Sequence, residues 1–234
     1  IDAAQDGETV KLIADVVYTD NDVFEGSMSK TLVEVAGKNI VLDMNGKNID
    51  VTYTGPNYLL SVIHVADGAG LTVTGEGSID VKGLNADGTA AKNIAYVFYK
   101  SGTTGYLTIV NGTFHMNDAA DSMVYTNGDE IVTINGGTFI LDAVASQTNG
   151  FPVIFSTQGN NERQIVVNAG TFNYDINHQI RPFEPYVAPE KAVKKVQIDG
   201  VDMWTIVPAQ AYVTELLGEW VNEAGEYAHN VGYA

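Results

Sequence analysis

The dominant pattern along the chain is a short phrase of apolar and polar residues that occurs five times. Each copy has an alternating apolar strand, a turn rich in Asn and Gly, and then a β-branched or aromatic residue, as in residues 132–139. The copies end at Ile49, Ile79, Phe114, Phe139 and Phe172, at spacings of 30, 35, 25 and 33 residues. Repeats in this range are typical of stacked supersecondary units that share one core.

A third apolar segment lies between successive copies, and no helical period separates them. These segments are residues 59–65, 94–99, 123–125 and 152–155. The economical prediction is an all-β chain folded as a right-handed parallel β-helix with three strands per coil. The terminal apolar residues of the copies should then form one interior column. Asn45, Asn135 and Asn168 precede that column by four residues and should stack as an amide ladder, whereas Asn111 precedes it by three and predicts a tighter corner.

The two ends of the chain differ from the repeats. Alternation at Val10, Leu12 and Ala14 predicts an N-terminal cap strand, followed by a polar loop over residues 18–30. The predicted organisation is a β-helix over residues 1–192, a closing hairpin over 193–208 around Asp199 and Gly200, and an amphipathic helix and tail over 209–234.

That helix has two interpretations. Its apolar face can cap the open end of the solenoid, or it can dock on a neighbouring subunit. The residues that would form the docking face are Leu216, Leu217, Trp220 and Val221.

Charge restricts the function more than length does. The 234 residues contain 29 acidic and 12 basic side chains, for a net charge of −17. Nucleic-acid binding needs a basic face, so this class is excluded, and an anionic membrane surface is disfavoured. No apolar run reaches the roughly 18 residues that membrane insertion needs. The acidity favours a solvated extracellular or saline setting, and the first residue, Ile1, suggests a processed or excised piece.

Residues 38–49, following residues 9–16, resemble the opening of right-handed parallel β-helix proteins of the pectate-lyase-like superfamily. The closest resemblance is to non-catalytic surface and virion β-helix proteins of gut bacteria and their phages, and residues 135–139, 186–189 and 204–208 fit the same group. The resemblance implies the fold and a place outside the cell, on a cell surface or on a virion. It also makes a homo-oligomer such as a trimer conceivable. It implies no activity, because this fold carries many.

Two enzyme templates exist on this fold, lyases and hydrolases that act on polysaccharides. The Gly-His-Gly and Arg-x-Lys motifs of the hydrolases do not occur, and the basic residues that a lyase needs are few. If the chain is nevertheless an enzyme, carboxylates stacked across coils are the candidates. They are Asp80, Asp118 and Asp121.

The sequence also offers candidates for metal and sugar sites. Four acidic residues, Asp20, Asp22, Asp129 and Glu130, are weak Ca²⁺ candidates, and the four histidines lack the spacing of a zinc site. No other cofactor is expected. Tyrosines near predicted strand ends either stack on sugar rings or fill loops. They are Tyr53, Tyr58, Tyr96, Tyr99, Tyr106 and Tyr125.

Three hypotheses follow. The first is a non-catalytic structural or adhesive module, such as a fibre, decoration or spacer, exposed on a bacterial surface or virion, with surface glycans or other surface proteins as partners. The second is a polysaccharide lyase or glycoside hydrolase. The third is a glycan-binding module without cleavage, which aligned surface aromatic residues would distinguish.

Overall fold

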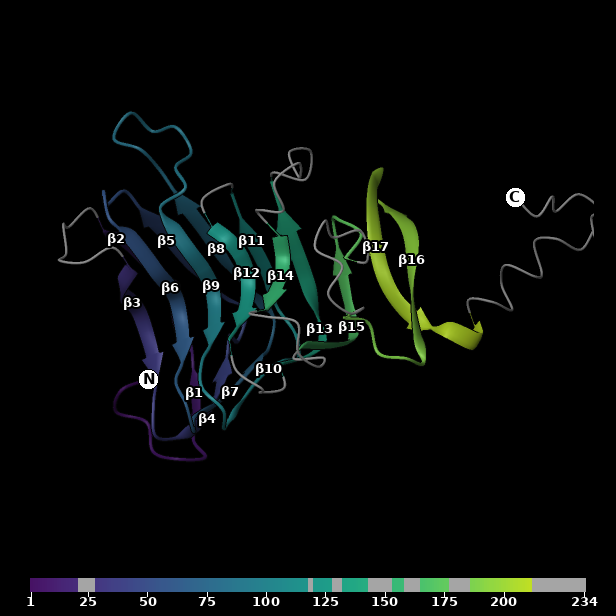
Figure 1. Cartoon of the computed structure of the whole chain (residues 1–234), viewed down its shortest axis with the longest axis horizontal. Helices are drawn as coiled ribbons and strands as arrows, with labels where there is room; N and C mark the ends of the chain where they lie inside the picture. The colour runs from purple at the N-terminus through teal and green to yellow at the C-terminus, as the bar shows by residue number, and fades with distance from the viewer. Residues whose placement is uncertain are drawn as a thin grey trace, which may run out of the picture.

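A computed structural model gives the structure of the chain and describes residues 1–20, 28–117, 120–127, 132–142, 153–157, 165–176 and 186–211. Its strands wind into an elongated β-solenoid, with the first strands at one end and a hairpin at the other (Figure 1). Successive coils pair in parallel along the long axis. The predicted parallel β-helix is therefore confirmed as a solenoid.

Each coil contributes strands to three walls. The first wall contains β1 (Thr9–Lys11), β4 (Asn39–Asp43), β7 (Gly70–Thr74), β10 (Tyr106–Ile109) and the first half of β13 (Val132–Leu141). The second contains β2 (Val16–Asp20), β5 (Lys47–Tyr53), β8 (Gly77–Gly83), β11 (Thr113–Met116) and the second half of β13. The third contains β3 (Met28–Val35), β6 (Tyr58–Val65), β9 (Ile94–Lys100), β12 (Ala120–Thr126) and β14 (Val153–Thr157).

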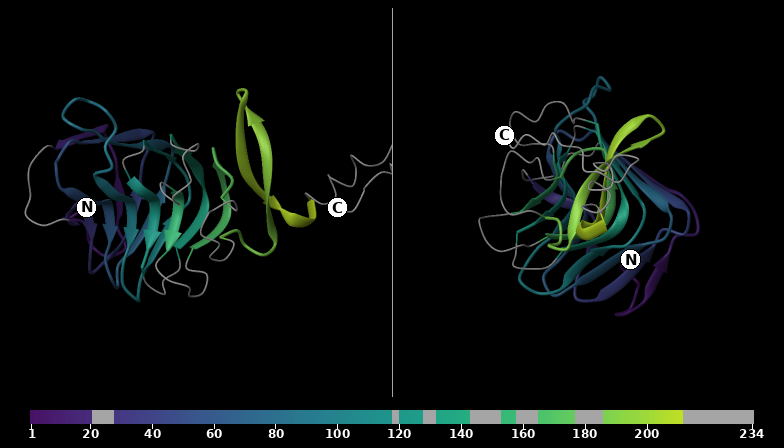
Figure 2. Two further views of the ribbon diagram at one scale, coloured as in Figure 1. Left: turned by 45° about the horizontal axis from the view of Figure 1, so that its top comes forward. Right: turned by 90° about the vertical axis from the view of Figure 1, so that its right-hand side faces the viewer.

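The C-terminal end leaves the parallel pattern. After β15 (Ile165–Phe172), the strands β16 (Lys191–Ile198) and β17 (Val201–Pro208) form an antiparallel hairpin. Its turn is Asp199-Gly200, and both residues have positive φ, as a two-residue turn of type I′ requires. Figure 2 shows the hairpin standing at the end of the stack, where Val193, Trp204 and Ile206 pack against the core. The predicted closing hairpin is confirmed.

The interior column predicted from the repeats is present. Ile49, Ile79, Phe114, Phe139 and Phe172 occupy successive in-register positions of the second wall. The Phe139 ring lies 5.1 Å from that of Phe114 and 5.2 Å from that of Phe172, measured between centroids. Such contacts add to the free energy gained by burying the rings.

The corners explain part of the Asn and Gly pattern. Asn168 Nδ2 donates to Asn135 Oδ1 at 2.9 Å, so these two residues form a rung of the predicted amide ladder. Asn45 does not join it, because its side chain donates to the Leu12 carbonyl at 2.8 Å while its backbone takes a positive φ. The tighter corner predicted from Asn111 is wrong, because the third copy pairs with the fourth in the same register before and after the corner, Ile109 with Ile134 and Thr113 with Thr138. Gly112, at φ 120°, takes the positive-φ position that Gly137 takes in the fourth copy.

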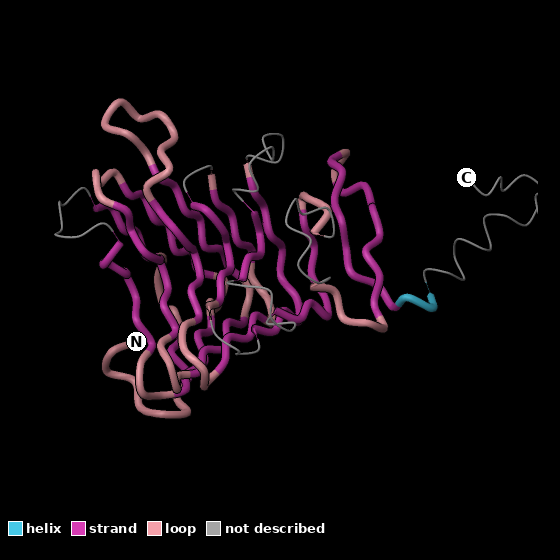
Figure 3. Tube along the Cα trace, viewed as in Figure 1, coloured by secondary structure: helices cyan, strands magenta, loops and turns pink. Residues whose placement is uncertain are grey.

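Two expectations about the ends need revision or stay open. The polar loop expected over residues 18–30 is wrong at both margins, because β2 extends to Asp20 and β3 begins at Met28. Of the predicted C-terminal helix, residues 209–211 are helical, and Leu216, Leu217, Trp220 and Val221 lie outside the described residues (Figure 3). Within the described part of the chain, no helix is long and apolar enough to cross a membrane.

Replacing Phe139 with Ala should test the interior column. The ring is fully buried and contacts three other aromatic rings, so the cavity should lower the free energy of unfolding by about 3–5 kcal/mol. Equilibrium unfolding in urea measures this. Val110→Ala is the control, since Val110 is 40% exposed and should change stability by less than about 0.5 kcal/mol. Equal effects of the two changes would contradict a shared aromatic column.

Candidate functional site

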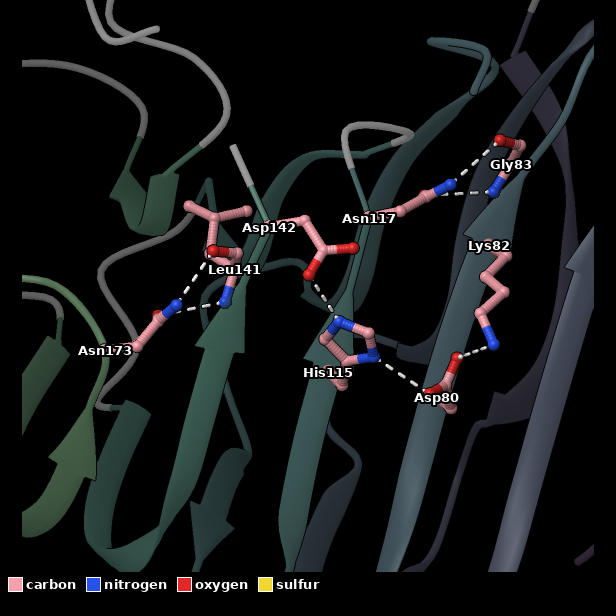
Figure 4. A network of polar contacts seen from close by, with 8 residues as sticks. All are labelled: Asp80, Lys82, Gly83, His115, Asn117, Leu141, Asp142 and Asn173. Atoms are coloured by element: carbon pink, nitrogen blue, oxygen red, sulfur yellow. Dashed lines mark hydrogen bonds and ion pairs between the residues drawn. The ribbon is translucent and has the colours of Figure 1, made fainter. Parts of the chain in front are cut away.

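A cluster of charged side chains lies on the outside of the second wall (Figure 4). Asp80 and Lys82 come from β8, His115 from β11, and Asp142 follows β13. His115 Nδ1 lies 2.8 Å from Asp80 Oδ2, and its Nε2 lies 2.8 Å from Asp142 Oδ1. Lys82 Nζ lies 3.1 Å from the other Asp80 oxygen. The register that stacks Phe114 on Ile79 inside also places His115 beside Asp80 outside.

The hydrogen bonds of His115 determine its charge. A carboxylate oxygen only accepts hydrogen bonds, so both ring nitrogens must donate, which an imidazolium does and a neutral imidazole does not. Partial burial lowers the pKa of His115, but the bonds to Asp80 and Asp142 outweigh it, and the pKa is raised above 6.5. Burial raises the pKa of Asp80, yet His115 and Lys82 hold it below 3.8.

Two asparagines complete the network in Figure 4. Asn117 forms a pair of hydrogen bonds with the backbone N–H and C=O of Gly83, and Asn173 does the same with Leu141. Each amide thus satisfies backbone groups at the point where a strand of the second wall ends. This wall is fixed on both sides of the charged cluster.

The charged cluster is poorly arranged for acid–base catalysis. A general base needs a free nitrogen or carboxylate oxygen directed at a substrate. Both nitrogens of His115 are occupied, and its ring fills the space between Asp80 and Asp142. Two positive groups offset the two carboxylates. We call Asp80, Lys82, His115 and Asp142 the charged brace, because their ion pairs link β8, β11 and the end of β13.

A second cluster, of aromatic residues, lies on the outside of the third wall. We call Tyr96 and Tyr99 of β9 and Tyr125 of β12, together with His64 of β6, the tyrosine cluster. The rings of Tyr96 and Tyr125 stack with centroids 4.1 Å apart at 7°, and His64 stacks on Tyr99 at 4.9 Å. Tyr99 also lies 5.4 Å from Tyr96 and 5.5 Å from Tyr125. All four side chains are partly exposed.

Local strand geometry brings the two tyrosines of β9 to one face. Val97 and Phe98 are both buried, while Tyr96 and Tyr99 on either side of them are partly exposed. In β6, Val62 and Ile63 are likewise both buried, but the residue before them, Ser61, is buried as well. Two consecutive inward side chains therefore replace strict alternation. Tyr99 then pairs in register with His64 on one side and Tyr125 on the other.

Polar groups surround the tyrosine cluster. Asn127 Nδ2 donates to the Tyr99 hydroxyl at 2.6 Å, and His64 Nε2 lies 2.7 Å from Ser101 Oγ. Burial raises the pKa of Asp121, and Lys92 opposes this only in part. Burial also raises the pKa of Tyr58, to which Asp121 adds. A carboxyl group with a raised pKa thus acts electrostatically on the hydroxyls of Tyr58 and Tyr96.

The structure separates the sequence candidates into groups. Tyr96, Tyr99 and Tyr125 come together. Tyr58 lies in the same region, because the charge of Asp121 acts on both Tyr58 and Tyr96. The prediction that Tyr53 can bind a sugar is wrong. Tyr53 is fully buried, and its hydroxyl donates to the Asn57 carbonyl at 2.8 Å, so its ring cannot stack on a ligand. Tyr106 lies apart, on the first wall, where it pairs with Gly70.

The candidate carboxylates do not assemble as one group. Asp80 belongs to the second wall and Asp121 to the third. Asp118, and the Ca²⁺ candidates Asp22, Asp129 and Glu130, lie outside the described residues, as does the side chain of Asp20. Among the side chains that the structure describes, no three of the His, Asp and Glu groups are arranged to hold a metal ion.

Sequence reasoning missed His115, Asp142 and His64. A signal for His115 exists in the repeats, because the residue after each interior anchor must point outwards. In consecutive copies these residues are Asp50, Asp80 and His115, which pair in register. Asp142 carried no such signal, since it follows the end of β13.

Comparisons with known proteins give no relative for the chain. No family model matches it, and no curated protein or solved structure matches it either. The resemblance to the pectate-lyase-like superfamily thus receives support for a parallel β-solenoid alone.

The two described histidines should titrate on opposite sides of pH 6.5. His115 is held above that value by its two carboxylates, whereas burial lowers the pKa of His64 and outweighs the effect of Glu34. NMR titration of the imidazole resonances, assigned with His115→Asn and His64→Asn variants, measures both. A His115 resonance that titrates below pH 6.5 would contradict the doubly bonded imidazolium.

Because of the same bonds, the difference in free energy of unfolding between the wild type and His115→Asn should depend on pH. Because the pKa of His115 is raised in the folded state, its protonation stabilises the fold fully below pH 6.5. That stabilisation is lost as the pH rises through the folded-state pKa. A lowered pKa of Asp80 stabilises above pH 3.8, and this is lost as pH falls through the folded value. His115→Asn should therefore lower the free energy of unfolding most between pH 3.8 and 6.5, by about 1 kcal/mol because the pair is partly exposed. At alkaline pH the loss should be smaller.

Proposed function

We propose that this chain is a non-catalytic β-solenoid module that binds glycans with the tyrosine cluster on its third wall. The observation that carries the proposal is the cluster itself: three partly exposed tyrosines from two adjacent strands in mutual ring contact. Aromatic rings offer apolar surface for the C–H groups of a sugar, and the phenol hydroxyls and Asn127 offer hydrogen bonds. Both kinds of contact occur in glycan recognition.

Rigidity of the cluster supports binding. Tyr96 pairs in register with Ser61 and Ser122, whose hydroxyls bond to Thr31 and Ser156 at 2.7 Å. The strands beneath are parts of one continuous sheet. Rings that are already held in place lose little conformational entropy when a ligand binds. A fixed row of rings that spans two adjacent strands suits an extended polymer better than a small molecule.

The charged brace supports the absence of catalysis. It contains the described histidine with the most carboxylate contacts, and its hydrogen bonds occupy every ring nitrogen. The proposal therefore assigns His115 and Asp80 to stability and not to chemistry. It requires no cofactor.

A place on a cell surface or virion is part of the same proposal. A net charge of −17 suits a protein that stays soluble in contact with bulk solvent. A glycan-binding face would meet its ligand there. Partners in such a setting are surface glycans or neighbouring surface proteins.

One observation favours a second candidate, a polysaccharide lyase or glycoside hydrolase. Burial raises the pKa of Asp121 next to the tyrosine cluster, and a general acid of a glycosidase has this property. Lys92 is the cationic group whose charge acts on Asp121. Asp121 on this face, rather than Asp80, is thus the residue on which an enzyme hypothesis would rest.

Retention on immobilised neutral and acidic polysaccharides, with product release followed in parallel, tests both candidates. We expect retention on at least one polymer without new reducing ends or unsaturated uronates. Tyr125→Ala should weaken that retention by about tenfold, because it removes a ring that contacts two others. Tyr99→Phe, which keeps the ring and loses the hydroxyl bonded to Asn127, should have a smaller effect.

Tyr106→Ala is the matched control, since Tyr106 is 37% exposed on another wall. It should bind like the wild type. Absence of retention on every polymer, or a folded Tyr125→Ala variant that binds normally, would refute the glycan-binding proposal. Product release that Asp121→Asn abolishes would instead establish the enzyme.

A further inference from the structure

A serine, a histidine and a glutamate form a hydrogen-bonded chain at the edge of the tyrosine cluster. Ser101 Oγ lies 2.7 Å from His64 Nε2, and His64 Nδ1 lies 3.3 Å from Glu34 Oε1. Glu34 belongs to β3 and His64 to β6, and the two residues pair in register. Ser101 follows the last residue of β9, which lies on the other side of β6. Three adjacent strands of the third wall thus bring a hydroxyl, an imidazole and a carboxylate together.

The carboxylate of Glu34 determines the direction of these hydrogen bonds. A carboxylate only accepts, so His64 Nδ1 donates to it. Burial lowers the pKa of His64 and outweighs the effect of Glu34, and the charge of Lys100 lowers the pKa further, so the imidazole is neutral at pH 7. A neutral imidazole has one N–H, which leaves Nε2 as an acceptor. Ser101 therefore donates its hydroxyl proton to His64 Nε2.

The Tyr99 hydroxyl is a second neighbour of the Ser101 hydroxyl. Tyr99 accepts a hydrogen bond from Asn127 at 2.6 Å, so its own proton is left to donate to Ser101 Oγ. Each of the two hydroxyls then accepts one bond and donates one. The proton of Ser101 stays directed at His64.

This arrangement activates a serine as a nucleophile. A serine hydroxyl reacts poorly until a neighbouring base takes its proton, and a third group has to hold that base in the correct tautomer. His64 is the base and Glu34 is the third group. His115 differs, because carboxylates occupy both of its ring nitrogens and neither can take a proton.

The corner that carries Ser101 is accessible and fixed. Ser101 is partly exposed, and Gly102 after it has a φ of 88°, which produces a sharp turn at the end of β9. Asp67 accepts a hydrogen bond from the backbone N–H of Thr104 at 2.8 Å. Lys100 Nζ donates to the carbonyls of Ser101 and Thr104 at 2.6 and 2.9 Å. A nucleophile on a fixed turn is already positioned for attack.

The same corner restricts which substrates can react. Attack on an ester produces an oxyanion, which backbone N–H groups stabilise. The N–H groups of Thr103 and Thr104 already donate to Asp67. Within the described ranges of the chain, the N–H of Gly102 has no hydrogen-bond partner and is the donor that remains next to Ser101. The lack of one donor slows such reactions by about a hundred- to a thousandfold, so an ester with a good leaving group is needed.

We propose that Ser101 is an activated nucleophile and a site of covalent acylation, and that its ligand class is an activated ester. Ser101 Oγ attacks the acyl carbon, and its proton passes to His64 Nε2 while Glu34 stabilises the imidazolium. The bond between the acyl carbon and the leaving oxygen then breaks, and His64 returns the proton to that oxygen. The products are an acyl ester of Ser101 and a free alcohol or phenol.

This modification goes beyond the glycan binding proposed above and does not depend on it. One acyl group is transferred to the chain and stays there, so the reaction is compatible with a non-catalytic module. Glu34 is a positioning residue in it, because it acts through His64 and does not contact the ester.

The probe for this site is p-nitrophenyl acetate, added to the full chain. It should release p-nitrophenolate in a burst that corresponds to one acetyl group per chain. Mass spectrometry with peptide fragmentation should place that group on Ser101 and not on Lys100. Ser101→Ala should abolish the burst. Ser78→Ala is the matched control and should react like the wild type, since Ser78 is partly exposed and donates to the side-chain oxygen of Asn48 instead of to a base.

The base and its positioning residue have separate readouts. His64→Asn should lower the rate of acetylation by about a hundredfold or more. The wild-type rate should rise with pH through the pKa of His64, below 6.5, and then become constant, because the neutral imidazole takes the proton. Glu34 raises that pKa while Lys100 lowers it, so Glu34→Gln should lower the rate and move the rise to lower pH. A purely structural Glu34 would leave the pH profile unchanged.

Three results would overturn the proposal when thermal unfolding shows that the variants fold. One is the absence of an acetyl group on Ser101. Another is acetylation of Ser101 that His64→Asn does not slow. The third is a burst that survives in Ser101→Ala and is lost in His64→Asn, since His64 would then be the nucleophile itself. Continuous release that Ser101→Ala abolishes would support Ser101 as the nucleophile and refute the non-catalytic module instead.

Discussion

The rest of the structure depends on the in-register parallel pairing of successive coils. Because each strand pairs with its counterpart one coil away, residues at the same position of the repeat stack on one another. Inside, this produces the column in which Phe139 contacts the rings of Phe114 and Phe172. Outside, it places side chains of different type in contact, since the outward positions are free to vary.

The two surface clusters are products of that freedom. Asp50 pairs with Asp80, and two carboxylates opposite each other are unfavourable. The next outward position in the column is His115, and Lys82 lies on the same strand as Asp80; together they neutralise it. On the third wall the corresponding column is His64, Tyr99 and Tyr125, where ring stacking replaces ion pairing. One wall therefore uses its outer face for charge balance and the other for aromatic surface.

The sequence was sufficient for the parts of the fold that the repeat determines. Alignment of the five copies predicted the interior column, and the apolar segments between the copies predicted the third strand of each coil. The alternating residues around Asp199 and Gly200 predicted the hairpin. It failed where a side chain found a closer partner: Asn45 bonds to Leu12 instead of joining the ladder. Tyr53, at the end of β5, was expected at the surface, but its hydroxyl could reach a backbone carbonyl from inside the core.

Recognising the tyrosine cluster needed information that alternation does not contain. A strand of period two would put Tyr96 and Tyr99 on opposite faces, because they are three residues apart. The two consecutive buried residues between them restore a common face, and the buried pair Val62 and Ile63 in β6 keeps the two coils in register. A local departure from the pleat, repeated from coil to coil, thus converts separate tyrosines into one surface. In-register pairing of the coils, which builds the core, therefore also decides which surface residues meet, provided that neighbouring coils share the same pair of consecutive buried residues.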